Sequence, residues 1–349
     1  MKAINCSVKK CYDKIVRVLS DNGMDETDAA VMASHLLQAD LWGIHTHGLK
    51  NLAGYIEKKN AGGVSFSAVP EIITECPSLV LIDANNSMGY IAGTFAMNMA
   101  CEMAEKTGIA MAVVRNSCHY GAGACYANIA AAKGMIGIAM SNVDRKMAIP
   151  GTRGMTIGHN PFTLCAPANR IPSVCLDVSS SNVASLKVLR AKSEHTEVPL
   201  GWICDKDGIP TNDPSHYPDE GALLPMGNHK GYGIAFFIDI LTGVLASSLN
   251  SVKDDIPSWC FDMEKPNLVS HAFVVINPNL LCTDFKEQVD EMIDAAHAKP
   301  KALNVERILV PGEDAWECYS ECEKTGTVTM PSDVVDELAK ILDIREIEA

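Results

Sequence analysis

The sequence predicts a mixed α/β protein in which the two ends of the chain build a helical domain beside an α/β domain. Helical hydrophobic patterns occupy residues 5–61, strand and helix patterns alternate between residues 79 and 178, and amphipathic helical patterns return at 285–298 and 333–342. We expect these last two helices to rejoin the N-terminal ones. The expected helical domain therefore comprises residues 1–70 with 283–349, and the expected α/β domain comprises residues 71–282.

The N-terminal region predicts two helices separated by a turn that carries histidines. Asp25 is a suitable N-cap for the helix before the turn, and Leu49 to Ala61 forms the helical pattern after it. The turn holds His45 and His47, which suit a metal pair, a structural turn, or one catalytic ring beside a spectator. A metal site needs a third and a fourth ligand at recognisable spacing, and none follows, so we predict no metal site.

The central region predicts the elements of the α/β domain. They are strands near Leu79–Ile82, 109–115, 135–141, 162–166, 173–178 and His271–Ile276, and helices over Gly89–Thr107 and Gly121–Lys133. Another helix starts at Lys230 and runs to about Ser247. Because this last helix is apolar almost all round, we predict that it is buried in the core.

His119 stands where a predicted buried strand gives way to a glycine-rich turn. The apolar run from Ile109 to Val114 predicts the strand, and the turn begins at Gly121. A histidine at the carboxyl end of a strand can lean into a crevice, where its titration near neutral pH suits acid–base chemistry. A single histidine is more often hydrogen-bonded within a turn, but the second histidine cluster upstream favours a functional role.

The turn Gly121-Ala122-Gly123 does not complete the dinucleotide-binding fingerprint of a Rossmann domain. The third small residue of that fingerprint falls at Tyr126, and the acidic residue expected about 20 positions later could only be Asp144, which lies beyond a further strand. The sequence therefore does not predict a Rossmann site at this turn.

Composition excludes several other classes of protein. A formal net charge of −14, with lysines and arginines interspersed among acids, argues against nucleic-acid binding. No uncharged apolar run is long enough for a membrane span, and residues 1–13 contain no apolar signal core. The 13 cysteines are scattered, odd in number and mostly inside apolar runs, as is typical of reduced thiols. We expect a soluble cytoplasmic protein without a nucleic-acid or membrane partner.

Seven motifs, in order along the chain, resemble one enzyme family. They are Asp40-x-x-Gly43-x-x-Thr46-His47-Gly48, Asn116-Ser117-x-His119-x-Gly121, Gly158-x-Asn160-Pro161, Asp177-Val178-Ser179-Ser180-Ser181, Gly208-x-Pro210-Thr211-x-Asp213-Pro214, Leu223-Leu224-Pro225-Met226-Gly227-x-x-Lys230-Gly231 and Val310-Pro311-Gly312-Glu313. Together they resemble the malate/L-lactate/L-sulfolactate dehydrogenase family, which also includes ureidoglycolate dehydrogenase, 2,3-diketogulonate reductase and cyclic imino acid reductases. The resemblance covers essentially the whole chain.

The resemblance implies an activity, a cofactor and an assembly. It implies a non-Rossmann α/β domain that binds a nicotinamide dinucleotide, NAD or NADP, and a homodimer. The implied reaction is hydride transfer between nicotinamide and a small 2-hydroxy or 2-oxo acid of the malate, lactate, sulfolactate or ureidoglycolate type. The alternative within the family is a reductase of a cyclic imino acid or a diketo sugar acid. The rival class is a hydrolase or lyase that uses the histidines, with or without a metal.

The resemblance also implies site residues. His47 and His119 match the two positions that exchange a proton with the substrate or orient it, in an order that the sequence leaves open, and Thr46 is positioned to hydrogen-bond the substrate. The implied cofactor contacts are Asp177, Val178, Ser179, His229, Lys230, Gly312 and Glu313. Independently of the resemblance, a lysine near the start of a predicted helix, together with that helix's free amides, suits a pyrophosphate.

The substrate region departs from the family at one position. Four residues after His47 the family usually has an arginine that pairs with the substrate carboxylate, whereas this chain has Asn51, with Lys50 beside it. Asn51 is therefore the candidate substrate contact at that position. Basic residues that could replace the missing arginine are Lys50, Arg145, Lys146 and Arg153. Alternatively, the substrate has no carboxylate there.

Overall fold

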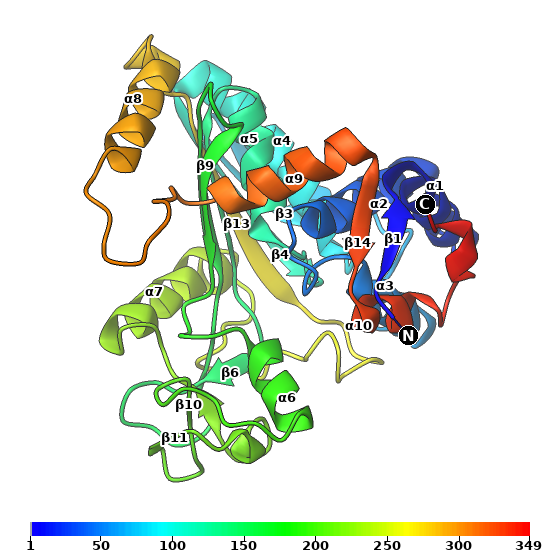
Figure 1. The fold of residues 1–349 in the computed structure, drawn as a ribbon. Helices are drawn as coiled ribbons and strands as arrows, with labels where there is room; N and C mark the ends of the chain where they lie inside the picture. The colour runs from blue at the N-terminus through cyan, green and yellow to red at the C-terminus, as the bar shows by residue number, and fades with distance from the viewer. Residues whose placement is uncertain (1) are drawn as a thin grey trace.

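The computed structural model describes residues 2–349, which form a central sheet with flanking helices, a smaller sheet and a helical unit (Figure 1). The helices are α1 (Val8–Asp21), α2 (Glu26–Leu41), α3 (Leu52–Asn60), α4 (Gly89–Thr107), α5 (Gly123–Ala132), α6 (Ser185–Ser193), α7 (His229–Asp239), α8 (Phe285–His297), α9 (Glu313–Thr325) and α10 (Ser332–Leu338). The strands are β1 (Ile4–Ser7), β2 (Glu71–Cys76), β3 (Leu79–Asp83), β4 (Ile109–Ser117), β5 (Ile136–Ser141), β6 (Arg145–Met147), β7 (Ile157–Gly158), β8 (Phe162–Pro167), β9 (Ser173–Val178), β10 (Ile203–Cys204), β11 (Pro210–Thr211), β12 (Ala222–Leu223), β13 (Val269–Ile276) and β14 (Thr327–Met330). Within this described range, none of the helices has the length and apolarity needed to cross a membrane.

The central sheet has seven strands in the order β2-β3-β4-β13-β5-β8-β9. β13 lies between β4 and β5 and is antiparallel to both, whereas β3 and β4 are parallel. α4 and α5 cover one face, where Ala96, Tyr126 and Phe273 share a buried core, and α7 packs on the other face over Met140 and Ala272. A largely antiparallel sheet differs from the doubly wound parallel sheet of a Rossmann domain, so the prediction of a non-Rossmann α/β fold is confirmed.

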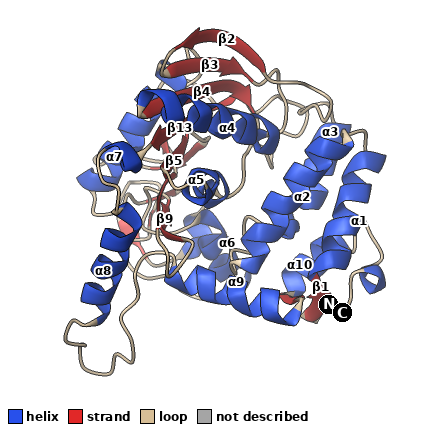
Figure 2. Ribbon diagram, turned by 90° about the horizontal axis from the view of Figure 1, so that it is seen from above, coloured by secondary structure: helices blue, strands red, loops and turns tan. Residues whose placement is uncertain are grey.

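The two ends of the chain meet in the helical unit. β1 pairs antiparallel with β14, with Cys6 opposite Val328, and both chain ends lie on this side of the molecule (Figure 1, Figure 2). Leu36, Tyr55 and Leu338 belong to the same buried core, so the helix predicted at 333–342 does rejoin the N-terminal helices, as α10. α9 runs from the sheet to this unit and packs on α2 (Figure 1).

The helix at 285–297 lies elsewhere than the sequence predicts. α8 lies beside the β8–β9 hairpin, where Asp290 accepts hydrogen bonds from the backbone amides of Asn169 and Arg170, both at 3.1 Å, and Asp294 pairs with the Arg170 guanidinium. The expectation that this helix rejoins the N-terminal helices is therefore wrong, because an amphipathic pattern specifies a buried face but not the surface that covers it. The boundaries of the two domains stay a prediction.

The apolar helix after Lys230 is only partly buried. It runs as α7 to Asp239 and continues as a π-helical turn, η3 (Ile240–Val244). Ala235 and Ile238 face the sheet, but Phe237 is 65% exposed and Val244 is 53% exposed. The prediction of a core helix is wrong for a single chain, because one side of this helix packs on the sheet and the other side faces solvent.

A small five-stranded sheet, in the order β11-β10-β12-β6-β7, forms with α6 a unit below the central sheet (Figure 1). It has its own core, which includes Met147, Ile157, Val188 and Leu223. The sequence did not predict this sheet, because strands of two or three residues are too short to show an alternating pattern. β2 escaped prediction for a different reason: all six of its residues are exposed, as an edge strand allows.

Candidate active site

The end of β4 is fixed in place before it delivers His119. The buried imidazole of His271 hydrogen-bonds Ser117 through Nε2 and Ser141 through Nδ1, both at 2.9 Å, and so ties β4 to β5 across β13. A Cβ atom on Gly89 would lie 2.3 Å from the carbonyl oxygen of Cys118, so α4 begins directly against this segment. Because the two residues before it, Ser117 and Cys118, are held in place, the backbone at His119 has a defined position.

The ring of His119 is enclosed by aromatic side chains. Trp259 stacks on it with 4.8 Å between centroids and 12° between planes. The hydroxyl of Tyr55, on α3, lies 2.6 Å from Nδ1 of His119 and 3.2 Å from the hydroxyl of Tyr90, on α4. Because Nδ1 is engaged by Tyr55, Nε2 is the nitrogen through which His119 can meet a ligand.

His47 reaches the same place from the turn after α2. Asp40, which is buried, accepts hydrogen bonds from His45 Nδ1 at 2.7 Å and from the amide of Leu49 at 2.8 Å. A Cβ on Gly48 would lie 2.4 Å from the carboxylate of Asp40, so only glycine fits there. These contacts fix the turn, and the rings of His47 and His119 lie 6.0 Å apart between centroids.

Two further contacts orient His47. The hydroxyl of Thr46 lies 2.9 Å from Nδ1 of His47, and the Asn51 side chain donates to the carbonyl of Thr46 at 3.0 Å. His45, in contrast, is turned toward Asp40, so His45 and His47 do not point at a common ligand. Among residues 2–349, no three His, Cys, Asp or Glu side chains gather in a group that could hold a metal ion.

Burial keeps both rings neutral. The pKa of His47 is lowered by burial, against the opposing effect of Asp177, and the pKa of His119 is lowered well below its usual value by burial and by the nearby His47, His271 and His159. A neutral imidazole has one nitrogen free to accept a proton. The two rings therefore form a pair of proton acceptors at neutral pH.

The predicted cofactor residues fall in three segments around β9. Asp177 accepts hydrogen bonds from Thr163 Oγ1 at 2.7 Å and from the amide of Ala124, in the first turn of α5, at 3.1 Å. Val178 and Ser179 follow it, and the Ser179 hydroxyl lies 3.1 Å from that of Ser181. The carboxylate of Asp177 thus lies at the start of α5, and it is close enough to affect the pKa of His47.

The start of α7 lies against the chain just after β9. A Cβ on Gly231 would come within 2.3 Å of the Ser180 carbonyl oxygen, so only glycine allows this approach. His229 and Lys230, in the first turn of α7, are exposed. In the described part of the chain, the Ser180 hydroxyl and Nδ1 of His159 are buried polar groups without a hydrogen-bond partner, and the Ser180 amide donates to the His159 carbonyl at 3.0 Å. These unpaired groups leave hydrogen-bonding capacity beside this segment for a polar ligand or for water.

Gly312 and Glu313 lie on the other side of β9. Gly312 has φ +82°, a conformation that favours glycine, and a Cβ there would lie 3.0 Å from Cβ of Cys175. The carboxylate of Glu313 accepts a hydrogen bond from the Val310 amide at 2.9 Å and lies 2.9 Å from Nε2 of His297. Both residues are thus held in fixed positions next to the strand that carries Asp177.

Most of the basic residues near the site are occupied by the chain itself. Lys50 pairs with Asp333 at 2.7 Å, the guanidinium of Arg145 contacts Ser251, Val252 and Asp255, and Arg153 is 75% exposed and 3.6 Å from Asp207. Lys146 differs, because its side chain is 15% exposed, pairs with Asp144 at 2.7 Å and lies over the ring of Phe261. Its charge contributes to lowering the pKa of His159 to about 4, although burial is the main cause.

Three residues in this region were not predicted as site residues. Tyr55 and Trp259 come from segments far from His119 in sequence, so no local pattern indicates their contact with it. His159 lies inside the motif Gly158-x-Asn160-Pro161, and a titratable residue within a motif that carries the family resemblance was an available signal.

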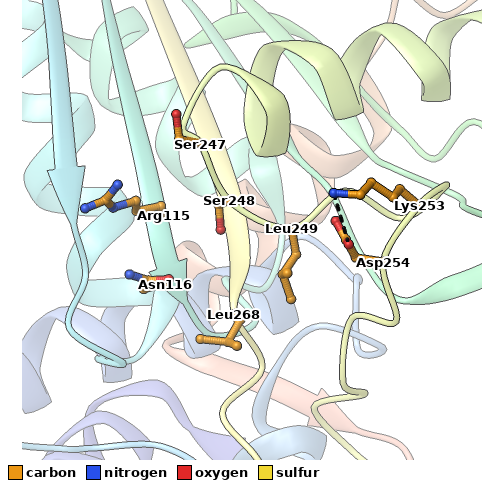
Figure 3. Close-up of a pocket in the computed structure, with 8 residues that line it drawn as sticks. All are labelled: Arg115, Asn116, Ser247, Ser248, Leu249, Lys253, Asp254 and Leu268. Carbon is orange, nitrogen blue, oxygen red and sulfur yellow. Dashed lines mark ion pairs between the residues drawn. The ribbon is translucent and has the colours of Figure 1, made fainter.

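A cavity of about 350 Å³ opens behind the end of β4 and does not include either histidine (Figure 3). It is lined by Arg115, Asn116, Ser247, Ser248, Leu249, Lys253, Asp254 and Leu268. Its charged groups are engaged, since Arg115 and Asn116 both bond Asp83 at 2.9 Å and the Lys253 ammonium points toward Asp254 (Figure 3). The side chain of Asn116 therefore holds the end of β3, and the candidate site rests on the histidine pair.

Comparison with known proteins agrees with the motifs. The sequence model of the malate/L-lactate dehydrogenase family matches residues 6–339. A malate dehydrogenase of Pyrococcus abyssi is 36% identical over 343 residues, covering 95% of this chain and 92% of that protein, and a ureidoglycolate dehydrogenase (NAD(+)) of Escherichia coli is 29% identical over 305 residues, covering 87% and 86%. The solved sulfolactate dehydrogenase of Methanocaldococcus jannaschii superposes with a TM-score of 0.89 at 28% identity, over 99% of each chain.

Proposed function

The chain belongs to the malate/L-lactate dehydrogenase family and is a nicotinamide-dependent dehydrogenase of small hydroxy acids, and we propose that His47 and His119 carry out its proton transfer. The observation that carries this proposal is the meeting of two enclosed, neutral imidazole rings, 6.0 Å apart between centroids, at the end of β4. Oxidation of a secondary alcohol removes the hydroxyl proton as hydride leaves the carbon. A neutral imidazole nitrogen accepts that proton, and the imidazolium returns it in the reverse direction.

We assign the proton exchange to Nε2 of His119 and the orientation of the same oxygen to His47. Tyr55 engages Nδ1 of His119, and its hydroxyl also contacts Tyr90, so a hydrogen-bonded chain supports the ring from behind. Thr46 engages Nδ1 of His47 in the same way. Each ring thus presents its other nitrogen, which lets the pair hold one substrate oxygen between them.

The residues around β9 fit a nicotinamide dinucleotide. When bound, the nicotinamide ring supplies the hydride acceptor or donor. The first-turn amides of α7, with Lys230 and His229, suit a pyrophosphate, and the close approach allowed by Gly231 brings them beside the unpaired hydroxyl of Ser180. We expect further contacts with the cofactor from Asp177, Val178, Ser179, Gly312 and Glu313. The carboxylates of Asp177 and Glu313 keep lone pairs that can accept hydrogen bonds from ribose hydroxyls.

For the substrate, we propose a 2-hydroxy or 2-oxo acid whose carboxylate binds Lys146. Lys146 is the least exposed of the four basic candidates. Lys146 and His47 each contribute to the low pKa of His159, which indicates that both lie near that ring. An ammonium shared between Asp144 and a ligand carboxylate is a charge-assisted contact. Asn51, which bonds the Thr46 carbonyl, supports the turn of His47 in place of the family's arginine.

We also propose a homodimer located in the cytoplasm. The solvent-facing side of α7 and η3 exposes Phe236, Phe237, Ile240, Val244 and Leu245. Exposed apolar side chains gathered on one side of a helix are typical of a protein interface, and a two-fold axis would cover them on both copies. All 13 cysteines are free thiols in the structure, as suits a reducing compartment.

Two measurements test the proposal. Thermal shift with NADH and NADPH should show stabilisation that rises with nucleotide concentration. On a panel of malate, lactate, sulfolactate and ureidoglycolate, with a cyclic imino acid and 2,3-diketogulonate as alternatives, His47→Ala and His119→Ala should each lower turnover by about 10²-fold or more while nucleotide binding persists. His195→Ala, at an exposed site, is the matched control. Near wild-type turnover of both variants would show that the histidines are not the acid–base pair.

A further inference from the structure

The segment between η3 and β13 forms a strap over the candidate site. This strap, residues 257–267, carries Trp259, whose indole stacks on His119 with 4.8 Å between centroids and lies tilted against Tyr55 with 4.9 Å between centroids. It has no regular helix or strand of its own. Two internal bonds brace it: the Ser258 amide donates to Asp262 at 2.9 Å, and the side chain of Lys265 pairs with Asp262 at 2.8 Å.

A buried lysine bonds the strap directly to α3. Lys58, near the end of α3, is completely buried, and its ammonium donates to the carbonyl of Asp262 at 2.9 Å and to that of Lys265 at 2.7 Å. Lysine is rarely buried without a carboxylate partner. Here the ammonium donates to two backbone carbonyls of an irregular segment, of which that of Asp262 also accepts from the Lys265 amide at 3.2 Å. Lys58 thus bonds the strap to α3.

We propose that Lys58 is a positioning residue for catalysis, which pins the strap so that Trp259 closes one face of His119 and holds that ring dry and correctly oriented. Lys58 and Tyr55 lie on the same helix, one turn apart, so α3 fixes the ring through Tyr55 and its cover through Lys58. The inference rests on the proposed function of His119, because a cover matters only if the ring exchanges protons.

The proposal sets a direction for the pH dependence. The titratable groups around His119 are His47 from the turn after α2, Tyr55 from α3, His159 from the loop after β7 and His271 from β13. Tyr90 of α4 lies behind Tyr55, and Cys118 is the chain neighbour of His119. Burial is the largest cause of the low pKa of His119. The face of an indole attracts an imidazolium and would by itself raise that pKa, whereas an indole that keeps water from the ring lowers it. The proposal requires the exclusion of water to be the larger of the two effects. Opening the strap therefore raises the pKa of His119 toward 6.5.

The test compares Lys58→Met with Trp259→Ala and their double variant. We expect each single change to move the acidic limb of kcat/KM upward by about one pH unit or more, since protonated His119 cannot act as a base. The double variant should move it no further than the larger single shift, because both changes open the same cover. Trp259→Ala alters no charge, so its shift cannot arise from the loss of an ammonium, and it gives the result even if Lys58→Met folds poorly. Lys59→Met is the matched control.

Acrylamide quenching of tryptophan emission measures how accessible Trp259 is, independently of enzyme activity. Quenching should increase in Lys58→Met relative to wild type, and Trp259→Phe identifies the part of the emission that comes from Trp259. An unchanged acidic limb with unchanged quenching in Lys58→Met, or shifts that add in the double variant, would overturn the inference. Full activity of His119→Ala would instead refute the proposed function. The quenching result would still show whether Lys58 holds the strap in place.

Discussion

Replacing Tyr55 by phenylalanine removes one hydroxyl group from directly behind His119. Tyr55 is completely buried, and its ring contacts Trp259 and His119, so phenylalanine keeps the packing of the site. The missing oxygen leaves Nδ1 of His119 and the hydroxyl of Tyr90 without the contacts at 2.6 and 3.2 Å. Burial raises the pKa of Tyr55 well above 10, so wild-type Tyr55 acts as a neutral hydroxyl and not as a phenolate.

The magnitude follows from the unpaired nitrogen. Leaving a buried polar group without its partner costs about 1–3 kcal/mol, and each 1.36 kcal/mol is about a factor of ten in rate. If the hydrogen bond strengthens as His119 gains a proton in the transition state, kcat/KM should fall by about 5- to 150-fold. The fall should appear mainly in kcat, because the hydroxyl faces the ring and not the substrate.

The assay is steady-state turnover of the best substrate of the panel, measured across the pH range for wild type, Tyr55→Phe and the control Tyr319→Phe. Tyr319 lies on α9, where its hydroxyl bonds Glu323 at 2.8 Å, so its loss should leave turnover unchanged. A Tyr55→Phe enzyme within twofold of wild-type kcat/KM would refute the reasoning that this hydroxyl supports the acid–base ring.

Two shorter predictions concern the substrate and the assembly. Lys146→Met should raise KM for carboxylate-bearing substrates by about 10- to 150-fold, corresponding to a lost charge-assisted contact of about 1.5–3 kcal/mol. The control Arg153→Met should change KM little. Equal KM values in the two variants would contradict the proposal that Lys146 binds the carboxylate. Phe237→Glu places a charge on the exposed apolar side of α7 and should convert the homodimer into a monomer, as measured by light scattering, whereas Leu200→Glu, at another exposed apolar site, should not. A wild-type protein that scatters as a monomer at micromolar concentration would contradict the dimer.

The elements that the sequence predicts best are long and strongly patterned. α4 has the predicted bounds, Gly89–Thr107, because a long helical pattern ends at Gly108 in a positive-φ conformation. The pairing of β1 with β14 was not predictable, because each strand has four residues and their contact joins the two ends of the chain. α9 also escaped prediction, since none of its residues is fully buried and its narrow stripe of Trp316, Tyr319 and Cys322, which are partly buried against neighbouring cores, stands among charged residues.

The candidate site divides in the same way. His47 and His119 each lie in a short motif with a glycine that the fold requires, and so they could be identified from the sequence. Their partners are set by tertiary packing: Tyr55, Trp259 and Lys58 meet His119 only because α3 and the strap fold against the end of β4. The sequence also could not show which basic residues are available to a substrate, since Lys50 and Arg145 form ion pairs with Asp333 and Asp255, which are remote in sequence.

The histidine that holds β4 gives the protein a specific sensitivity to acid. Burial lowers the pKa of His271 to about 3, against about 6.5 in an unfolded chain. Because the folded pKa is the lower one, this residue's stabilisation is present above pH 6.5 and is lost as the pH falls toward 3. At about pH 5 the unfolded histidine binds a proton that the folded one does not, so the free energy of unfolding should fall by about 2 kcal/mol from this residue alone.

His271→Asn should be less stable than wild type at about pH 7.5, since it loses a hydrogen bond and ring packing, but should lose about 2 kcal/mol less on going to pH 5. Urea unfolding at the two pH values measures both terms, with His195→Asn as the same substitution at an exposed site. If His271→Asn and wild type lost equal stability between the two pH values, His271 would not be the neutral cross-strand support that the geometry indicates.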